Sequence, residues 1–366
     1  MHYLIITSEF PPGPGGIGMH AYCMAKGLVH NGTKITIVCS MDYTTEAEIS
    51  SFLTSLPENL TVHRIKRNGF LTYINRITII LSLCKEHKFD KVILTGRFPL
   101  WIGIMLKKIF GEKIRTEAII HGSEIKIGNS LTQYLTRQAI MIADKCHAVS
   151  AYTKALIQDK NISRDINVLP NGLDISSWSD VDVVVPFEWK GYPKLLTVGS
   201  ITQRKGQHNI IRSLQRIIEK YPEVHYYIAG KDDNKSELTD LINRLKLQNN
   251  ISILGKLSEK DLKRAYKSAD VFCMLSEATK DGDVEGFGIA VLEANIYGLA
   301  AIGSSNTGLE DAIQDDKTGY LVNAHDATAV LSSIDKLLGK DKKILSENCK
   351  SWAMKHDWNI LSRALM

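Results

Sequence analysis

The sequence predicts an α/β protein with two doubly wound parallel sheets, that is, two Rossmann-like domains that face a central cleft. Short apolar strands alternate with amphipathic helices in the first half of the chain, and the same alternation restarts in the second half. Between the halves, residues 173–193 are irregular and rich in Trp and Pro. At 366 residues, the chain is long enough for two domains that each bury a core.

The first half predicts five strands and four helices. Strands that alternate with helices form parallel sheets, because each helix carries the chain back to the start of the next strand. Ser150 is placed to cap the last of these helices. The strands are Tyr3–Thr7, Ile35–Cys39, Val92–Thr95, Glu117–Ile120 and Cys146–Val149, and the helices are Met19–Val29, Tyr73–Lys85, Leu131–Ala143 and one from about Tyr152.

The second half predicts a further parallel sheet with its helices. The strands are Lys194–Gly199, His225–Ala229, Ile251–Leu254, Val271–Leu275 and Ala300–Gly303. The helices are Gln207–Lys220, Glu237–Leu245, Glu259–Ser268, Ile289–Tyr297 and Ala327–Leu338. We therefore expect an N-terminal domain over residues 1–175 and a C-terminal domain over residues 190–344, with the Trp/Pro segment as a hinge. Residues 345–366 are predicted to form a helix that crosses back to the first domain.

Composition indicates a globular protein, with 44% hydrophobic and 23% charged residues. The six cysteines lack metal-type spacing and are expected to be buried thiols in a reducing compartment. The chain opens directly into a strand, and its apolar stretches are too short to span a bilayer. We expect a cytoplasmic protein, with a peripheral position on the inner face of the cell membrane as an option.

Basic residues concentrate in residues 60–115, which hold 12 Lys and Arg against 3 Asp and Glu. Aromatic and apolar groups are interleaved with this charge at residues 65–71 and 101–110. Such a surface suits an anionic membrane. The alternative is a helix that faces the core and keeps its lysines in water. Nucleic acid is disfavoured, because no known binding motif occurs.

The segment from Glu285 to Glu293 predicts a binding site for a nucleotide-linked sugar. Gly286 and Gly288 suggest a tight loop that leads into a helix, whose first amides are open to a phosphate. A carboxylate would repel that phosphate, so Glu285 and Glu293 are expected to hold hydroxyl groups. The alternative is a loop and a buried helix with two solvated acids.

The glycine loop after the first strand allows two interpretations. Gly13, Gly15 and Gly18 match GxGxxG, and Asp42 follows the second strand, as in a dehydrogenase that binds NAD. Against this, residues 9–12 separate the strand from the loop, and Pro14 has no amide to offer. We favour a loop whose amides approach a diphosphate, followed by a helix with a favourable dipole.

Three further side chains are candidates for the same chemistry. Arg204 and Lys205 lie in a loop between a strand and a helix, and both suit phosphate oxygens. His121 follows a strand and is placed to bond a sugar hydroxyl. The alternatives are a solvated basic pair and a structural histidine. Two DxD triplets, Asp180–Asp182 and Asp281–Asp283, are interpreted as chance, and no metal site is predicted.

With these motifs in order, the chain resembles the GT-B glycosyltransferases of family 4, a retaining group that includes bacterial mannosyl-, glucosyl- and N-acetylglucosaminyltransferases. The resemblance covers nearly the whole chain. The amino-acid sequence of residues 283–288 and 204–207 is most similar to that of phosphatidylinositol-mannoside-type mannosyltransferases. The shared elements are Gly15-Gly16, His121, Val149-Ser150, residues 170–174, Arg204-Lys205-Gly206, the pair Glu285/Glu293, Gly308, Glu310 and residues 318–322.

The resemblance implies a role for each element. His121, Glu285, Arg204 and Lys205 form the implied catalytic set, with His121 beside the transferred sugar and Glu285 on its hydroxyls. Gly15, Gly16, Arg204 and Lys205 hold the donor diphosphate. The amides of Gly286, Phe287, Gly288 and Ile289 bind the donor's phosphate and sugar, Glu293 the ribose, and Lys256 and Leu257 the base. Ser200 stands where many relatives carry Arg, and Arg204 is expected to supply that charge.

The resemblance also implies the reaction. A sugar passes from a UDP-sugar or GDP-sugar to a glycan or lipid-linked acceptor, with retention, without a metal and without a cofactor, in the synthesis of envelope polysaccharide or glycolipid. The alternatives are an oxidoreductase that uses the GxGxxG-like loop and NAD(P), a sugar-nucleotide epimerase with the same fold, and a non-catalytic sugar-binding protein with that fold.

Overall fold

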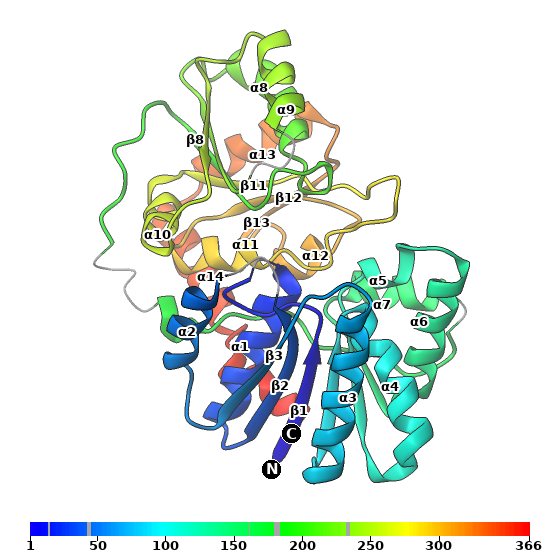
Figure 1. Cartoon of the computed structure of the whole chain (residues 1–366). Helices are drawn as coiled ribbons and strands as arrows, with labels where there is room; N and C mark the ends of the chain where they lie inside the picture. The colour runs from blue at the N-terminus through cyan, green and yellow to red at the C-terminus, as the bar shows by residue number, and fades with distance from the viewer. Residues whose placement is uncertain (14, 42–44, 161, 179–183, 232–234) are drawn as a thin grey trace. The chain divides into compact units, whose positions relative to one another are not determined.

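The computed structural model describes residues 1–366 except 14, 42–44, 161, 179–183 and 232–234. The chain divides into two compact units (Figure 1). Unit 1 comprises Met1–Asp174 and Asp357–Met366, and unit 2 comprises Ile175–His356. Each unit is described below by itself.

Unit 1 contains a parallel sheet of seven strands in the order β3-β2-β1-β4-β5-β6-β7. The order reverses between β1 and β4, which pair in register from Tyr3 with Lys91. Ligands bind at such a reversal in doubly wound sheets. The strands are β1 (His2–Thr7), β2 (Lys34–Met41), β3 (Leu60–Lys66), β4 (Lys91–Thr95), β5 (Thr116–Ile120), β6 (Lys145–Ala148) and β7 (Asn167–Val168).

The helices of unit 1 cover this sheet, and their apolar faces complete its core. α1 packs against α15, and α4 packs against α6. Ser150 caps α7, as the sequence predicts, by accepting a hydrogen bond from the amide of Thr153. The helices are α1 (Gly16–His30), α2 (Glu46–Thr54), α3 (Leu71–Glu86), α4 (Arg97–Phe110), α5 (Ser123–Lys126), α6 (Ser130–Ile142), α7 (Ala151–Gln158) and α15 (Trp358–Leu361), with 3-10 turns at Gly111–Lys113 and Ser362–Leu365.

Unit 2 repeats the plan with six parallel strands in the order β10-β9-β8-β11-β12-β13. Its reversal lies between β8 and β11. The strands are β8 (Lys194–Val198), β9 (His225–Ala229), β10 (Ile251–Gly255), β11 (Val271–Met274), β12 (Ala301–Ser304) and β13 (Gly319–Val322). The helices are α8 (Gln207–Ile218), α9 (Lys235–Arg244), α10 (Glu259–Ser268), α11 (Ile289–Ile296), α12 (Leu309–Ala312), α13 (Ala327–Gly339) and α14 (Lys342–Met354), with 3-10 turns at Ile175–Trp178 and Gln203–Lys205.

The segment predicted to be a hinge packs on unit 2 where the structure describes it. The ring of Trp189 stacks on Tyr227 with centroids 3.9 Å apart, and the ring of Trp178 meets the edge of Tyr266. Lys263 donates a hydrogen bond to the carbonyl oxygen of Ser177. The residues from 175 onward therefore belong with unit 2, whereas the sequence places the start of this domain at residue 190.

The C-terminal segment is two helices in place of the single helix predicted over 345–366. α14 ends at Met354 and packs on α11 in unit 2, so the division falls after His356 and not after residue 344. Asp357 then caps α15 by accepting from the amide of Asn359. Trp358 is fully buried in unit 1. Its backbone lies so close to Gly27 that a Cβ added to Gly27 would be 2.3 Å from the carbonyl oxygen of Trp358.

Candidate active site

Unit 2 brings three of the predicted side chains into one ion-pair cluster. Arg204 and Lys205 follow β8, and Glu285 lies in the loop after β11, the neighbouring strand at the sheet's reversal. The Nζ of Lys205 lies 2.7 Å from Oε2 of Glu285, and Nη1 of Arg204 lies 2.5 Å from the same oxygen. Parallel strands that are neighbours end at the same edge of the sheet, so residues 80 positions apart meet there.

Charge keeps Glu285 ionised although it is buried. Burial by itself raises the pKa of its carboxyl, but the ammonium of Lys205 and the guanidinium of Arg204 lower that pKa to about 2. The amide of Phe287 also donates a hydrogen bond to the carboxylate. Glu285 is therefore negative at neutral pH, and the cluster holds two fixed cations beside one acceptor-only group.

Asp283 is a partner that the sequence analysis missed. Its Oδ2 lies 2.9 Å from Nε of Arg204 and so fixes the guanidinium from a second side. The sequence interprets the DxD triplet that contains it as chance, and the structure gives Asp283 an ion pair with Arg204. The other triplet, Asp180–Asp182, includes residues outside the described part of the chain. Over the described ranges, no group of three or more His, Cys, Asp or Glu side chains is arranged to hold a metal ion.

The loop from Gly286 to Ile289 leads into α11, as the sequence predicts. Gly288 is the N-cap residue, with φ +93°, and a Cβ there would lie 2.4 Å from Cδ2 of Leu309. Glycine offers no capping side chain, so the first amides of α11 are not capped by that residue. A Cβ on Gly308 would lie 2.1 Å from the backbone of Gly286, which gives Gly308 a physical reason to be glycine.

Glu293 lies on α11, about one turn beyond its first residue, Ile289. The hydroxyl of Tyr266 donates a hydrogen bond of 2.5 Å to its Oε2. Burial raises the pKa of Glu293, although the hydroxyl of Tyr266 and the charge of Lys205 act in the opposite direction. Tyr266 lies on α10, and no sequence motif indicates its role.

The remaining residues predicted in unit 2 lie farther along the sheet edge. Ser200 is exposed directly after β8, and its carbonyl oxygen accepts from the side chain of Gln207. Lys256 and Leu257 follow β10, the outer strand, which β9 separates from β8. Lys256 is exposed and Leu257 half-buried. They share the edge with Arg204 but take no part in its ion pairs.

Unit 1 places the glycine loop and His121 near its own sheet reversal. α1 begins at Gly16, with Gly15 as its N-cap at φ +130°, and a Cβ on Gly16 would meet nothing within 4 Å. A Cβ on Gly15 would collide with the carboxylate of Glu9, at 1.8 Å. The two glycines thus leave the start of α1 uncovered by side chains of their own. Pro14 and Asp42, on which the NAD interpretation depends, lie outside the described residues.

His121 follows β5 and is held by several groups. Its Nε2 lies 2.8 Å from the hydroxyl of Thr95, the last residue of β4, and its amide donates to the carboxylate of Glu124. The imidazole rings of His121 and His20, which lies on α1, are edge to face with centroids 4.7 Å apart. Burial lowers the pKa of His121 to about 4 and raises that of Glu124 to about 7. His121 is therefore a neutral imidazole at neutral pH.

Comparisons with known proteins show the family of the chain. A family model described as Glycosyl transferases group 1 matches residues 185–356, and one described as Glycosyltransferase Family 4 matches residues 14–177. The chain belongs to family 4 of the glycosyltransferases. The resemblance inferred from the motifs is thereby confirmed.

Individual relatives of this glycosyltransferase are distant. An uncharacterised glycosyltransferase of Methanocaldococcus jannaschii is 25% identical over 99% of this chain and 96% of its own. A GDP-mannose-dependent alpha-(1-6)-phosphatidylinositol monomannoside mannosyltransferase of Mycolicibacterium smegmatis is 24% identical over 96% and 93%. The solved structure of Anabaena HepE in complex with UDP has a TM-score of 0.78 at 16% identity and covers 100% of this chain and 98% of its own. That likeness confirms the GT-B fold.

Proposed function

We propose that this glycosyltransferase moves a sugar from a nucleoside-diphosphate sugar to a glycan or lipid-linked acceptor, with retention and without a metal. The observation that carries the proposal is the cluster of Arg204, Lys205 and Glu285 beside the uncapped start of α11. Cations and open amides suit a diphosphate, and a carboxylate suits sugar hydroxyls. The names of the relatives support it, since one uses GDP-mannose and HepE was solved with UDP.

Each predicted residue has a proposed role in this reaction. Arg204 and Lys205, with the glycine loop at Gly15 and Gly16, hold the donor diphosphate, and Ser200 lies at its edge. The amides of residues 286–289 bind the donor's phosphate and sugar. Glu285 holds hydroxyls of the transferred sugar, Glu293 holds the ribose, and Lys256 with Leu257 borders the base.

We propose that the reaction proceeds on one face of the sugar. The acceptor oxygen forms a bond to the anomeric carbon, the bond from that carbon to the diphosphate oxygen breaks, and the departing diphosphate takes the acceptor's proton. Arg204 and Lys205 stabilise the charge that the diphosphate gains. His121, neutral because desolvation lowers its pKa to about 4, acts as a hydrogen-bonding group beside the sugar and not as a fixed cation. The protein's contribution is positioning and charge stabilisation.

Nucleotide binding tests the proposal against its alternatives. We expect UDP or GDP to raise the melting temperature, because a ligand that binds only the folded state adds about 2.7 kcal/mol of stability at a hundredfold excess over its Kd. ADP and NADH serve as comparison ligands in the same thermal-shift series. Stabilisation by NADH alone would instead support an oxidoreductase. Mass spectrometry with a panel of donor sugars completes the test, since an epimerase converts the donor when no acceptor is present.

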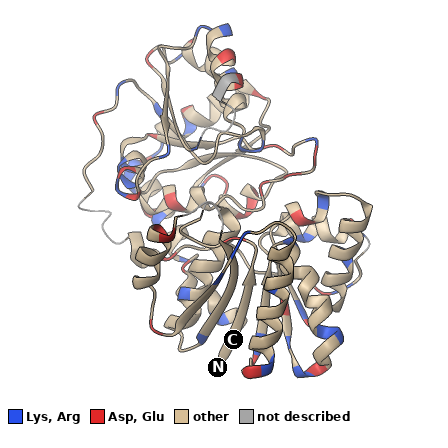
Figure 2. Ribbon diagram, viewed as in Figure 1, with Lys and Arg blue, Asp and Glu red and all other residues tan. Residues whose placement is uncertain are grey.

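The basic stretch of residues 60–115 supports a second proposal, which concerns the acceptor. Its two parts differ in the structure. α4 faces the core with Leu100 and Leu106, and Lys107 pairs with Asp144, so residues 101–110 largely follow the core-facing interpretation. By contrast, Phe70 is 76% exposed at the start of α3, followed by the exposed Leu71, Tyr73 and Ile74. Charge elsewhere is mixed over both units (Figure 2).

We propose that residues 66–74 contact an anionic membrane that holds a lipid-linked acceptor. No helix within the described ranges is long and apolar enough to cross a bilayer. We expect the protein to sediment with anionic vesicles at low salt, and Phe70→Ser/Leu71→Ser to abolish this sedimentation. Leu131→Ser, which changes another exposed leucine of unit 1, on α6, is the control. Equal sedimentation of both variants would count against this surface.

A further inference from the structure

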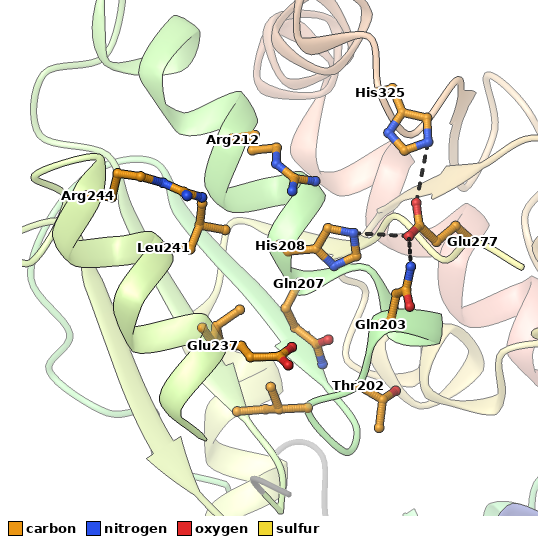
Figure 3. Close-up of a pocket in the computed structure, with 12 residues that line it drawn as sticks. Thr202, Gln203, Gln207, His208, Arg212, Glu237, Leu241, Arg244, Glu277 and His325 are labelled. Carbon is orange, nitrogen blue, oxygen red and sulfur yellow. Dashed lines mark hydrogen bonds and ion pairs between the residues drawn. The ribbon is translucent and has the colours of Figure 1, made fainter. Parts of the chain in front are cut away.

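Unit 2 contains a pocket that the proposed reaction does not use. It encloses about 400 Å³ between the first half of α8, helix α9 and the loops that follow β11 and β13 (Figure 3). This volume is within the range of small-molecule sites. Ile201, Leu238 and Leu241 form its apolar part and are buried. The pocket shares no lining residue with the cluster of Arg204, Lys205 and Glu285.

One wall of the pocket offers buried hydrogen-bond acceptors. Gln207 is only 1% exposed, and its Nε2 donates to the carbonyl oxygen of Ser200 at 3.1 Å. That bond fixes the orientation of the amide, because only the nitrogen can donate. Oε1 of Gln207 and the hydroxyl of Thr202 are buried, and neither has a hydrogen-bond partner among the described residues. Unsatisfied buried polar atoms are costly, which suggests that a ligand with hydroxyl groups completes them.

The opposite side of the pocket offers cations. Arg212 projects from α8 and Arg244 from α9, on the side away from Gln207 and Glu237 (Figure 3). Arg212 donates to the side-chain oxygen of Asn209 at 3.3 Å. Neither guanidinium pairs with a carboxylate in the part of the chain that the structure describes. Two arginines without an acidic partner are suited to an anionic group, which each can bind through two parallel hydrogen bonds.

Glu277, the second carboxylate that lines the pocket, is already engaged. Its carboxylate accepts from Gln203 and Asn209 and lies 3.2 Å from His208 and 3.3 Å from His325 (Figure 3). These four donors occupy the lone pairs of both oxygens. Glu277 therefore orders the polar wall and leaves the arginines available. Glu237, exposed on α9, remains on the acceptor side.

We propose that this pocket binds an acidic saccharide, that is, a hydroxylated sugar ring with one carboxylate or phosphate group. The anionic group contacts Arg212 and Arg244, the hydroxyls donate to Gln207 and Glu237, and the ring covers the leucines. The pocket is a second carbohydrate site on unit 2, separate from the donor cluster. A sugar phosphate and a uronic acid residue of a glycan share this chemistry.

Calorimetric titration of the whole protein distinguishes a sugar phosphate from a uronic acid as the ligand. Glucose 6-phosphate and glucuronic acid are the two acidic sugars. Glucose has the hydroxylated ring without an anionic group, and inorganic phosphate is an anion without a ring. We expect at least one acidic sugar to bind at least tenfold more tightly than glucose or phosphate. The acidic sugar that binds identifies the anionic group. If neither acidic sugar binds at millimolar concentration, the proposal is wrong.

Variants locate the binding. The double variant Arg212→Gln/Arg244→Gln is expected to bind the acidic sugar at least tenfold more weakly than wild type, because charge-assisted hydrogen bonds are lost. Glu237→Ala is expected to lower the affinity for the acidic sugar and to leave the affinity for inorganic phosphate unchanged. Arg216→Gln, on the same helix outside the pocket, is the matched control. Lys205→Ala is expected to keep full affinity. Binding lost in Lys205→Ala and kept in the double arginine variant would assign the sugar to the donor cluster and overturn the proposal.

Discussion

Replacing Lys205 by alanine is expected to lower the turnover of sugar transfer by roughly one to three powers of ten, the usual cost of losing a charge-stabilising group. The ammonium of Lys205 lies 2.7 Å from Glu285 and is one of two cations available to a donor diphosphate. Without it, the departing diphosphate gains its charge beside Arg204 alone. Glu285→Ala should have a similar effect, because it removes the group proposed to hold the sugar. Steady-state kinetics with the donor that the panel identifies is the measurement.

Two controls separate this effect from loss of structure. Lys340→Ala removes a different ion pair of unit 2, with Asp316 at 2.8 Å, and should keep the wild-type rate. The folding of Lys205→Ala is followed by its melting temperature, since Arg204 still pairs with Glu285 in that variant. Transfer by well-folded Lys205→Ala at the wild-type rate would show that the donor cluster has been assigned to the wrong residues.

Replacing Lys91 by methionine is expected to lower the free energy of unfolding of unit 1 by about 3–5 kcal/mol, the cost of leaving a buried charge without its partner. Lys91 and Glu117 are buried on neighbouring strands, with Nζ and Oε1 2.8 Å apart. Lys91 also donates to the carbonyl oxygen of Leu365, near the C-terminus. Methionine fills similar volume and has no charge, so His147, at 3.1 Å, is the one ionic partner that Glu117 keeps among the described residues. Urea titration measures the change.

The pH dependence gives this prediction a sign. Burial raises the pKa of Glu117, but hydrogen bonds from His147 and Lys91 outweigh it, and the net pKa is lowered. A carboxyl whose pKa is lower in the folded state than in the unfolded state stabilises the folded protein at pH values above the unfolded-state pKa. This contribution is lost as the pH falls through the folded-state pKa. The difference between wild type and Lys91→Met should therefore shrink in acid. A difference that grows in acid would contradict the assigned charge state.

Matched variants test the cause. Lys66→Met breaks an exposed pair with Glu46 in the same unit and should not change stability measurably. The double variant Lys91→Met/Glu117→Leu removes both buried charges and should recover part of the loss, because an apolar pair needs no partner. If the double variant is as unstable as Lys91→Met, packing and not charge explains the effect.

Most of the central strands were predictable because their signal is local. β1, β4 and β8 are continuous apolar runs, as expected of strands buried on both faces of a parallel sheet. Of the four edge strands, β10 was predicted, whereas β3, β7 and β13 were missed. β3 includes His63 and Arg64 and is only partly buried, and β7 has two exposed residues. An edge strand lacks a neighbour on one side and needs fewer apolar residues, so its pattern resembles that of a loop.

The candidate site was predictable as separate motifs and not as a set of contacts. Gly286, Gly288 and the basic pair after β8 carry their chemistry in residue type and spacing. That Arg204 also bonds Asp283, that Tyr266 bonds Glu293, and that Thr95 lies against His121 depend on which strands and helices are neighbours. The same holds for Trp178 and Trp189, whose partners are distant in the sequence.

The amino-acid sequence alone therefore fixes the periodic elements of this glycosyltransferase, its two-part α/β organisation and the types of group that can bind a donor. These properties depend on a few adjacent residues, whose spacing along a helix or strand is set by backbone geometry. The partners of Glu285, the lowered pKa of His121, the division of the C-terminal segment at Asp357 and the pocket between α8 and α9 emerge only on folding. Each depends on how elements far apart in the chain pack together, as the order of strands in a sheet brings Arg204, Lys205 and Glu285 to one edge.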